Sequence, residues 1–248
     1  MHRDVIYYKE VDSTNTKIKE LAKTAKEGLV VVADRQTAGR GRRGRTWEST
    51  EEGNLYMSVL LKPELEVTKA AMLTLVMAYS VAKALQRWEI DVQIKWPNDL
   101  IMGKKKICGI LTEMEVLDGQ IDFIVVGVGL NLGQQVFSEE LKEKATSIFA
   151  ETGRRIDREQ VLSAIMDVFE ENYACFLENK SLEFLMQDYN DLLVNRDKQV
   201  VVLDPAGEYE GYAQGINVDG ELQVLRADGT STSVFAGEVS VRGIYGYV

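Results

Sequence analysis

The chain has 248 residues, 45% of them hydrophobic, and a formal net charge of -10 at pH 7. This predicts a globular protein with a full core, and the acidic balance argues against one that coats nucleic acid or an anionic membrane, which would need a broad basic surface. The only histidine is His2 and there are two cysteines, so histidine-based catalytic pairs or triads, histidine zinc sites and four-cysteine metal sites are excluded.

The chemistry that remains uses Lys, Arg, Asp and Glu side chains, backbone donors and a hard metal ion held by oxygen atoms. Cys108 and Cys175 are too few for a disulfide framework, so we expect free thiols. The N-terminal residues lack the charged and then apolar arrangement of a signal peptide. These features predict a protein of the reducing cytoplasm.

The first predicted elements are a helix and two strands. Ser13 is a plausible helix N-cap, and apolar residues recur at helical spacing from Thr14 until Gly28 can end the helix. The polar residues beside this cap could also bind a small polar group. Residues 28–34 and 54–61 are rich in β-branched or apolar residues and predict strands. The glycine- and arginine-rich stretch between them is therefore expected to be a loop.

This loop contains GRGRRGRTW at residues 39–47. Arginines bind phosphate or carboxylate oxygens in pairs, glycines let backbone N–H groups approach an anion, and Trp47 offers a surface for stacking. The spacing matches neither GxxxxGK[ST] nor the GxGxxG turn. The residues alone leave phosphate or nucleotide binding and an ordinary solvated or RNA-binding loop about equally open.

An apolar helix and a β-hairpin are expected next. Residues 68–88 predict a long helix with a buried face, and its apolar window 70–85 contains Thr, Ser and Lys, so we expect no membrane span. Residues 106–132 predict two strands that turn at Asp118 and Gly119.

The segment KWPNDL lies between that helix and the hairpin, at residues 95–100. Proline is disfavoured in the middle of a strand, so Pro97 places Asn98 and Asp99 in a loop between two strands. Their side chains are then free to meet a ligand, although Asn and Asp are also common in ordinary turns.

Three residues of the hairpin are candidates for function. Strand alternation places Lys106 on a face with Cys108 and Ile110 that is otherwise apolar, although consecutive lysines are most often a solvated hairpin end. Gly109 inside a strand indicates either close approach by a ligand or backbone, or a bulge. Asn131, if buried, could satisfy a backbone N–H or contact a metal ion that carries phosphates.

The last third of the chain changes from helices to strands. Asp157 and Gln160 resemble a capping box, and a further helix is expected from Ser181. Beyond about Asn195, short β-branched runs alternate with Asp-Pro and Asp-Gly turns. This predicts a small all-β unit after a larger first domain, with boundaries at residues 1–195 and 196–248.

Taken in order, six segments resemble the sequence blocks of the biotin protein ligases. The GRGRRGR block is highly specific, and the resemblance runs through the chain. It implies an α+β fold with a class II aminoacyl-tRNA synthetase/biotin ligase-like catalytic domain, built on a mixed β-sheet with helices, and then a small SH3-like β-barrel. The segments are DSTN (12–15), QTAGRGRRGRTW (36–47), KWPNDL (95–100), KICGIL (106–111), GVGLN (127–131) and FAGEVSVR (235–242).

The resemblance also implies which residues form the site. Lys106 and Arg42 are expected in catalysis. Asp99 is our own candidate for the transfer step, which needs a group that orients the incoming lysine and accepts its proton. Asn131 is expected near a magnesium ion that is bound through the nucleotide. The residues expected around biotin are Ser13, Thr14, Gln36, Gly39, Arg40, Arg42, Lys106 and Gly109, and those expected around the nucleotide are Arg40, Arg42, Arg43, Arg45, Trp47, Lys106, Asn131 and Arg242.

The implied activity forms biotinyl-5'-AMP from biotin and ATP with Mg²⁺, and then transfers biotin to a lysine of a biotin carboxyl carrier protein. Only eleven residues precede Asp12, too few for a winged-helix DNA-binding domain, so no repressor function is expected. No nucleic acid or membrane partner is expected, and monomer and homodimer both stay open. Two rival functions are a lipoate or octanoate ligase or transferase and a non-enzymatic nucleic-acid-binding module, which the net charge disfavours.

Overall fold

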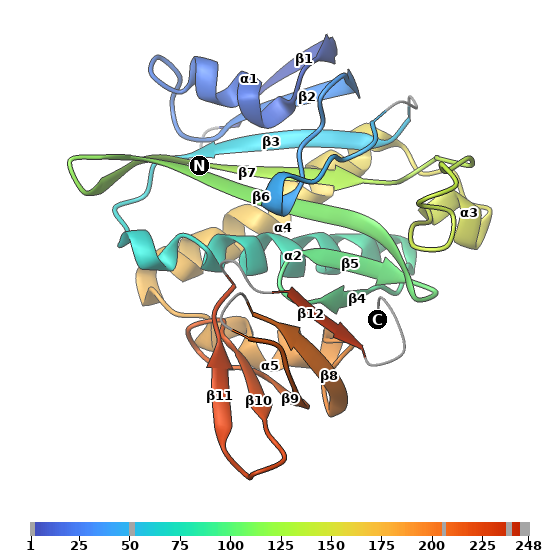
Figure 1. Ribbon diagram of the computed structural model, residues 1–248. Helices are drawn as coiled ribbons and strands as arrows, with labels where there is room; N and C mark the ends of the chain where they lie inside the picture. The colour runs from blue at the N-terminus through green and yellow to red at the C-terminus, as the bar shows by residue number, and fades with distance from the viewer. Residues whose placement is uncertain (1–2, 50–52, 205–206, 237–239, 244–248) are drawn as a thin grey trace.

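The computed structural model describes residues 3–49, 53–204, 207–236 and 240–243 (Figure 1). Within these ranges the larger sheet has seven strands in the order β1-β2-β3-β7-β6-β5-β4. β1 is parallel to β2, whereas every other neighbouring pair is antiparallel, so the sheet is mixed as expected. The strands are β1 (Asp4–Val11), β2 (Leu29–Gln36), β3 (Leu55–Leu61), β4 (Gln93–Lys95), β5 (Asp99–Met102), β6 (Lys105–Leu117) and β7 (Gln120–Leu130).

Helices cover both faces of this sheet. On one face lies α1 (Thr14–Leu21), where Ile18 packs against apolar residues of β2, β3 and β7. On the other face lies α2 (Met72–Leu85), and α4 (Arg158–Asn179) packs against α2. Because both faces are covered, the interior strand β3 is buried along its whole length, and its sequence is apolar apart from Ser58.

The core helix α2 was predicted correctly. It is flanked by short 3-10 turns, Val67–Lys69 and Gln86–Trp88. The combined segment Val67–Trp88 is long and apolar enough to cross a membrane by length and composition, but 72% of its most apolar window is buried inside the protein. It is therefore the central helix of a folded core.

A smaller antiparallel sheet follows α5 (Glu183–Leu192), as the sequence predicted. Its hydrophobic residues join the same core as α2, and the Trp96 indole N–H donates to the Gly220 carbonyl at 3.0 Å. The two sheets are thus packed into one body. In the described residues the order is β11-β10-β9-β8-β12, with β8 (Lys198–Leu203), β9 (Tyr209–Ile216), β10 (Leu222–Leu225), β11 (Ser231–Val234) and β12 (Ser240–Gly243).

Most local predictions are confirmed. The β6–β7 hairpin turns at Asp118 and Gly119, both of which have positive φ, and the Asp157 carboxylate accepts a hydrogen bond from the Gln160 N–H at 2.9 Å. The arginine-rich stretch joins β2 to β3, and α3 (Ile148–Thr152) is a further short helix after β7.

Two predictions are wrong and one strand was missed. The first helix ends at Leu21, because residues 22–28 form turns before β2 begins. Asp99 is the first residue of β5 rather than part of a loop, since it pairs with Lys95 on one side and Gly109 on the other. The edge strand β1 was missed because its exposed and half-buried residues give no buried apolar stripe.

Candidate active site

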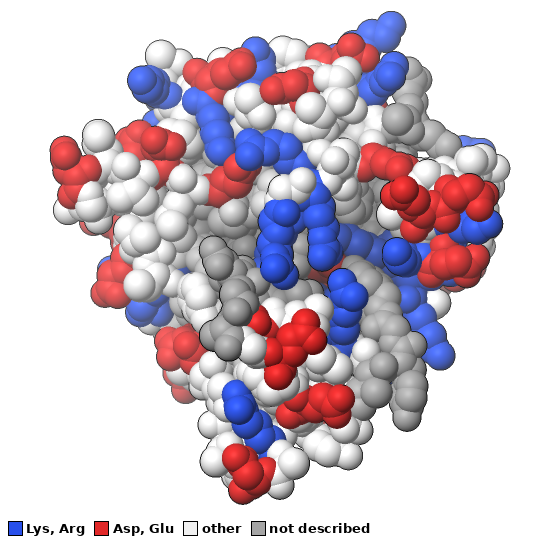
Figure 2. All heavy atoms as spheres, in the orientation of Figure 1, with Lys and Arg blue, Asp and Glu red and all other residues white. Residues whose placement is uncertain are grey.

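A cavity of about 860 Å³ is lined by residues of both sheets. The larger sheet contributes the β2–β3 loop, the β4–β5 turn, the start of β6 and the segment after β7, and the smaller sheet contributes β8 and β12. Lys and Arg side chains gather in the middle of this face (Figure 2), in a chain whose overall charge is negative. The cavity is therefore suited to an anionic ligand.

The arginine loop folds back on itself above this cavity. Two backbone hydrogen bonds close it, from Gly41 N–H to the Arg45 carbonyl at 2.7 Å and from Trp47 N–H to the Gly39 carbonyl at 3.0 Å. At its tip Gly44 has a φ of 71°, in the left-handed region that glycine adopts without strain. The loop is thus a hairpin closed by backbone hydrogen bonds, and residues 43–46 at and after its tip are exposed.

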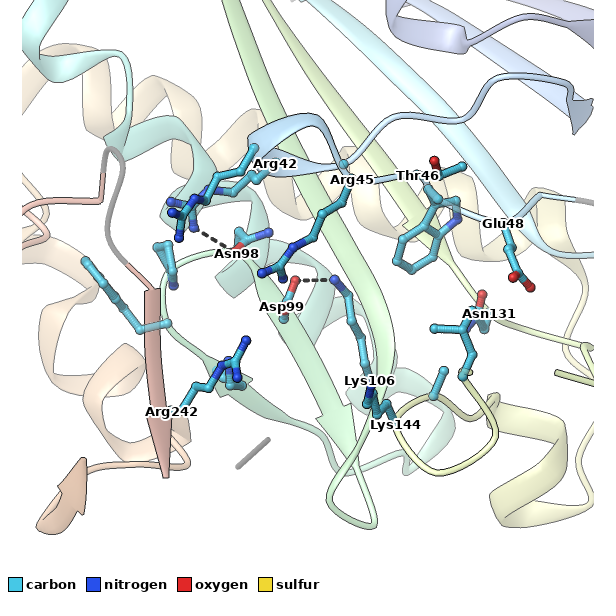
Figure 3. A pocket seen from close by; sticks show the side chains of 18 of the residues that line it. Arg42, Arg45, Thr46, Glu48, Asn98, Asp99, Lys106, Asn131, Lys144 and Arg242 are labelled. Carbon is cyan, nitrogen blue, oxygen red and sulfur yellow. Dashed lines mark hydrogen bonds and ion pairs between the residues drawn. The ribbon is translucent and has the colours of Figure 1, made fainter. Parts of the chain in front are cut away.

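Lys106 and Asp99 form an ion pair at the cavity wall, with the lysine Nζ 2.6 Å from the Asp99 Oδ1 (Figure 3). Their side chains are only 25% and 11% exposed, so water screens the pair less than it would on the surface. The Lys106 ammonium also lies 5.1 Å from the centre of the Trp47 ring. Neighbouring strands β5 and β6 thus bring together a cation and a carboxylate that the sequence placed in separate blocks.

Lys95 is a cavity residue that the sequence reasoning missed. It is buried beside Asp99, and burial lowers its pKa to about 8, with Lys106, Arg242 and Arg45 acting in the same direction and Asp99 opposing them. Its position as a lysine directly before Trp-Pro, next to the buried Ile94, was the signal that could have found it.

Arg42 connects three parts of the molecule. Its guanidinium donates to the Asn98 Oδ1 at 2.9 Å and to the Ala236 carbonyl of the smaller sheet region at 2.9 Å. The Asn98 amide is itself held, because its Nδ2 donates to the Ile110 carbonyl at 3.2 Å. Burial lowers the pKa of Arg42, and the Asp99 carboxylate opposes that shift.

A second, smaller cavity of about 50 Å³ lies beside the first. Trp47 lines both cavities and therefore forms part of the boundary between them. The polar wall of the smaller cavity includes Thr14, Asn15, Gln36 and Arg40, and glycines of β6 and β7 form another part of its wall.

Two of those glycines make room for the Trp47 ring. Gly109 and Gly129 are register partners on β6 and β7, and a Cβ atom on either would lie 2.8 or 2.6 Å from the indole. The group that approaches Gly109 closely is thus a side chain, not the ligand or backbone that the sequence led us to expect. The buried indole N–H has no hydrogen-bond partner among the described residues.

The structure brings most of the predicted site residues to these two cavities. Ser13 and Gly39 are buried beside the site but do not belong to the described lining of either cavity. Cys108 is buried, and burial raises the pKa of its thiol, as expected of an inert cysteine. The predicted residues that line one or both cavities are Thr14, Gln36, Arg40, Arg42, Arg43, Arg45, Trp47, Asp99, Lys106, Gly109, Asn131 and Arg242.

Asn131 is the candidate metal contact. It is buried just after β7, and its amide nitrogen donates to the Thr146 carbonyl at 3.0 Å, so its amide oxygen is the atom available to a cation. It lines the larger cavity together with Glu48 (Figure 3). The described residues contain no group of three or more His, Cys, Asp or Glu that could hold a metal ion. A cation here would need further oxygen ligands from a bound molecule.

Comparison with protein families gives two matches. Residues 7–131 match the Biotin/lipoate A/B protein ligase family, and residues 197–242 match the Biotin protein ligase C terminal domain.

Individual relatives and one solved structure are similar over most of the chain. The Bifunctional ligase/repressor BirA of Bacillus spizizenii is 36% identical over 235 residues, which are 92% of this chain and 71% of that protein. The Biotin--[acetyl-CoA-carboxylase] ligase of Paracoccus denitrificans is 29% identical over 238 residues, with 94% and 98% covered. The biotin protein ligase from Aquifex aeolicus in complex with biotin and ATP has a TM-score of 0.88 and 36% identity, with 98% and 100% covered.

Proposed function

The chain belongs to the Biotin/lipoate A/B protein ligase family, and from this we propose that it is an ATP-dependent biotin protein ligase. It joins the biotin carboxylate to AMP with release of pyrophosphate, and then transfers the biotinyl group to a lysine of a biotin carboxyl carrier protein. The observation that carries this function is the Lys106–Asp99 pair in a cationic cavity that adjoins a smaller polar one.

In the first step a carboxylate oxygen of biotin attacks the α-phosphorus of ATP, and the bond from that phosphorus to the pyrophosphate oxygen breaks. Two anions must meet and negative charge builds on the α-phosphoryl oxygens, so fixed positive charge is the main requirement. Lys106 is our candidate to contact both the carboxylate and the α-phosphate, and Trp47 to lie near the adenine. The further cations proposed around the nucleotide are Arg40, Arg42, Arg43, Arg45 and Arg242.

In the second step the carrier lysine loses a proton, its nitrogen attacks the biotinyl carbonyl carbon, and the bond to AMP breaks. A free lysine is protonated at neutral pH, so this step needs a proton acceptor. Asp99 is our candidate to orient the incoming ammonium group and accept its proton. Lys106, 2.6 Å away, stabilises the carboxylate before the proton arrives.

Magnesium is a further part of the proposal, and when bound it offsets the charge on the nucleotide phosphates. Asn131 would hold it through the amide oxygen. The phosphates would supply most of the other ligands, because the described residues offer no carboxylate cluster.

We assign the larger sheet to the class II aminoacyl-tRNA synthetase/biotin ligase-like fold and the smaller one to the SH3-like barrels, with the boundary between residues 195 and 196. We further propose that the protein works in the cytoplasm, that its partners are carrier domains of biotin-dependent carboxylases such as acetyl-CoA carboxylase, and that neither nucleic acid nor membrane is a partner.

The proposed function is tested by exchange of labelled pyrophosphate into ATP with magnesium and biotin. Parallel reactions contain lipoate or no acid. We expect exchange with biotin alone. Exchange with lipoate instead would favour the lipoate ligase function, and no exchange with either acid would mean that the cavity binds another anion.

Removal of the Arg42 guanidinium is expected to loosen retention of biotinyl-5'-AMP. Arg42→Ala loses both hydrogen bonds that tie the loop to Asn98 and Ala236, so roughly tenfold faster release is expected. Filter binding of labelled intermediate measures this rate. Arg35→Ala, which removes an exposed arginine on β2, is the control, and equal release from both variants would contradict the prediction.

Lys95 is expected to make ATP binding depend on pH. A lysine is charged below its pKa and neutral above it, so a pKa of about 8 predicts that the KM for ATP rises between pH 7 and pH 9. Loss of one charged contact to a polyphosphate corresponds to about a tenfold rise. In Lys95→Arg the charge persists at both pH values, so the ratio of the two KM values should stay near one. The same ratio in parent and variant would rule Lys95 out.

A further inference from the structure

Glu113 of β6 is a charged residue that the mechanism above does not use. Its side chain is 17% exposed, and its carboxylate receives donors from two other segments. The Lys19 ammonium and the Arg40 guanidinium lie 2.8 and 3.3 Å from Oε1, and the Asn15 amide nitrogen donates to Oε2 at 2.8 Å. Burial opposes ionisation, but the bonds from Lys19 and Asn15 outweigh it and lower the pKa of Glu113. The group is therefore a carboxylate at neutral pH.

An ionised carboxylate only accepts hydrogen bonds, and this fixes the orientation of Asn15. The amide must turn its NH₂ group toward Glu113, where the Leu111 carbonyl also accepts at 3.3 Å. The Asn15 oxygen then faces the Ser58 hydroxyl, which donates to it at 2.6 Å. Because a hydroxyl has one proton, Ser58 has none left for its other neighbour, Thr14.

This fixed direction of hydrogen-bond donation continues into the smaller cavity. The Thr14 hydroxyl oxygen lies 2.7 Å from the Ser58 hydroxyl oxygen and 3.2 Å from the Gln36 Oε1. Because the Ser58 proton is used toward Asn15, the shorter contact requires Thr14 to donate to Ser58. Gln36 is oriented from its far side, because its Nε2 donates to Ser49 at 2.8 Å and its Oε1 accepts the Thr14 backbone N–H at 2.8 Å. The Thr14 hydroxyl oxygen and the Gln36 carbonyl oxygen, both in residues of the cavity wall, are left as acceptors.

We propose that Glu113 is a positioning residue that fixes this proton order, so that the smaller cavity selects acids whose ring carries N–H donors. The inference rests on the proposed function and deepens it. The ureido ring of biotin has two N–H groups, whereas the dithiolane ring of lipoate has none. A buried polar wall discriminates strongly against a ligand that leaves its atoms unpaired.

Glu113→Gln is expected to reverse the direction of hydrogen-bond donation from Asn15 to Thr14. Both cations lie at Oε1, so the single oxygen of glutamine stays with Lys19 and Arg40, and its NH₂ group replaces Oε2 in front of Asn15. The Asn15 amide must then rotate so that its NH₂ group donates to Ser58. The Ser58 proton is then directed at Thr14, and the Thr14 hydroxyl loses Ser58 as its acceptor. Asn15→Asp in the same chain restores an acceptor on both sides, toward residue 113 and toward Ser58.

The test measures biotin KM and kcat by pyrophosphate exchange, with a thermal melt of each variant. Glu113→Gln should raise the biotin KM about tenfold with kcat and the ATP KM within about twofold, as expected for lost ground-state binding. The double variant Asn15→Asp/Glu113→Gln should recover most of that loss. Glu115→Gln, two residues along the same strand and exposed, is the matched control and should leave the biotin KM unchanged.

The inference is overturned if Glu113→Gln behaves like Glu115→Gln, or if the double variant binds biotin no better than Glu113→Gln. Should Glu113→Gln not fold, Ser58→Ala breaks the same chain in its middle, turns the Thr14 hydroxyl toward the Gln36 oxygen 3.2 Å away, and should also raise the biotin KM. An unchanged KM in Ser58→Ala overturns the inference as well. Absence of biotin-dependent exchange in the parent would instead refute the proposed function.

Discussion

Lys106→Ala is expected to lower the rate of biotin-dependent pyrophosphate exchange about 10³-fold at saturating substrates, the size of effect found when a preorganised group that stabilises transition-state charge is removed. Lys106 is paired, three-quarters buried and held on a strand, so its ammonium is in place before the anions arrive. The ammonium contacts the Asp99 carboxylate and also lies 5.1 Å from the centre of the Trp47 ring. The measurement is the initial rate of label transfer from pyrophosphate to ATP.

The adjacent Lys105→Ala is the control for this prediction. Its ammonium donates to the Lys142 carbonyl at 2.8 Å, and the residue is half-buried. It removes the same charge from the chain without touching the Asp99 ion pair, and should change the exchange rate less than twofold. A Lys106→Ala variant that melts like the parent and keeps a tenth of its activity would show that the charge is supplied elsewhere.

Asp99→Asn is expected to separate the two half-reactions. The amide has the shape of the carboxylate but cannot take a proton, so transfer from preformed biotinyl-5'-AMP to a carrier protein should slow about 10²-fold, within the usual range for a general base. Exchange should stay within about threefold, because Lys106 and the arginines remain. Single-turnover transfer of labelled biotin to the carrier measures the first rate, and pyrophosphate exchange the second.

Asp118→Asn provides a chemically matched control at the tip of the β6–β7 hairpin, where its φ of 51° suits asparagine as well as aspartate. It should not change either rate. Unchanged transfer in Asp99→Asn would remove this carboxylate from the mechanism and leave the phosphate of the adenylate as the proton acceptor. An equal loss in both assays would mean that Asp99 mainly positions Lys106.

The predictions from sequence were strongest where structure depends on nearby residues. The arginine loop, the hairpin at Asp118 and Gly119, and the cap at Asp157 follow from turn and capping chemistry within a few positions, and each is confirmed. The predicted end of the first helix is wrong, because Gly28 can stop a helix but does not ensure that the helix extends that far.

Side-chain partners across the fold could not be predicted in this way. The environments of Lys95 and Glu113 depend on residues far away in the chain. Arg242 contributes to the lowered pKa of Lys95, and Asn15 donates a hydrogen bond to Glu113. Nothing in a local pattern gives the sign or distance of those contacts. The sequence pointed to Lys106 and Asp99 separately, and only the pairing of β5 with β6 made them one unit.

The contribution of β12 to the cavity has a consequence for biosynthesis. Arg242 lies two hundred positions after Arg42, and it reaches the site only once β12 has paired with β8. A nascent chain that has completed the larger sheet already holds the arginine loop and Lys106, yet one wall of its cavity is still missing. The larger cavity is therefore closed on that side only by the last described strand of the chain.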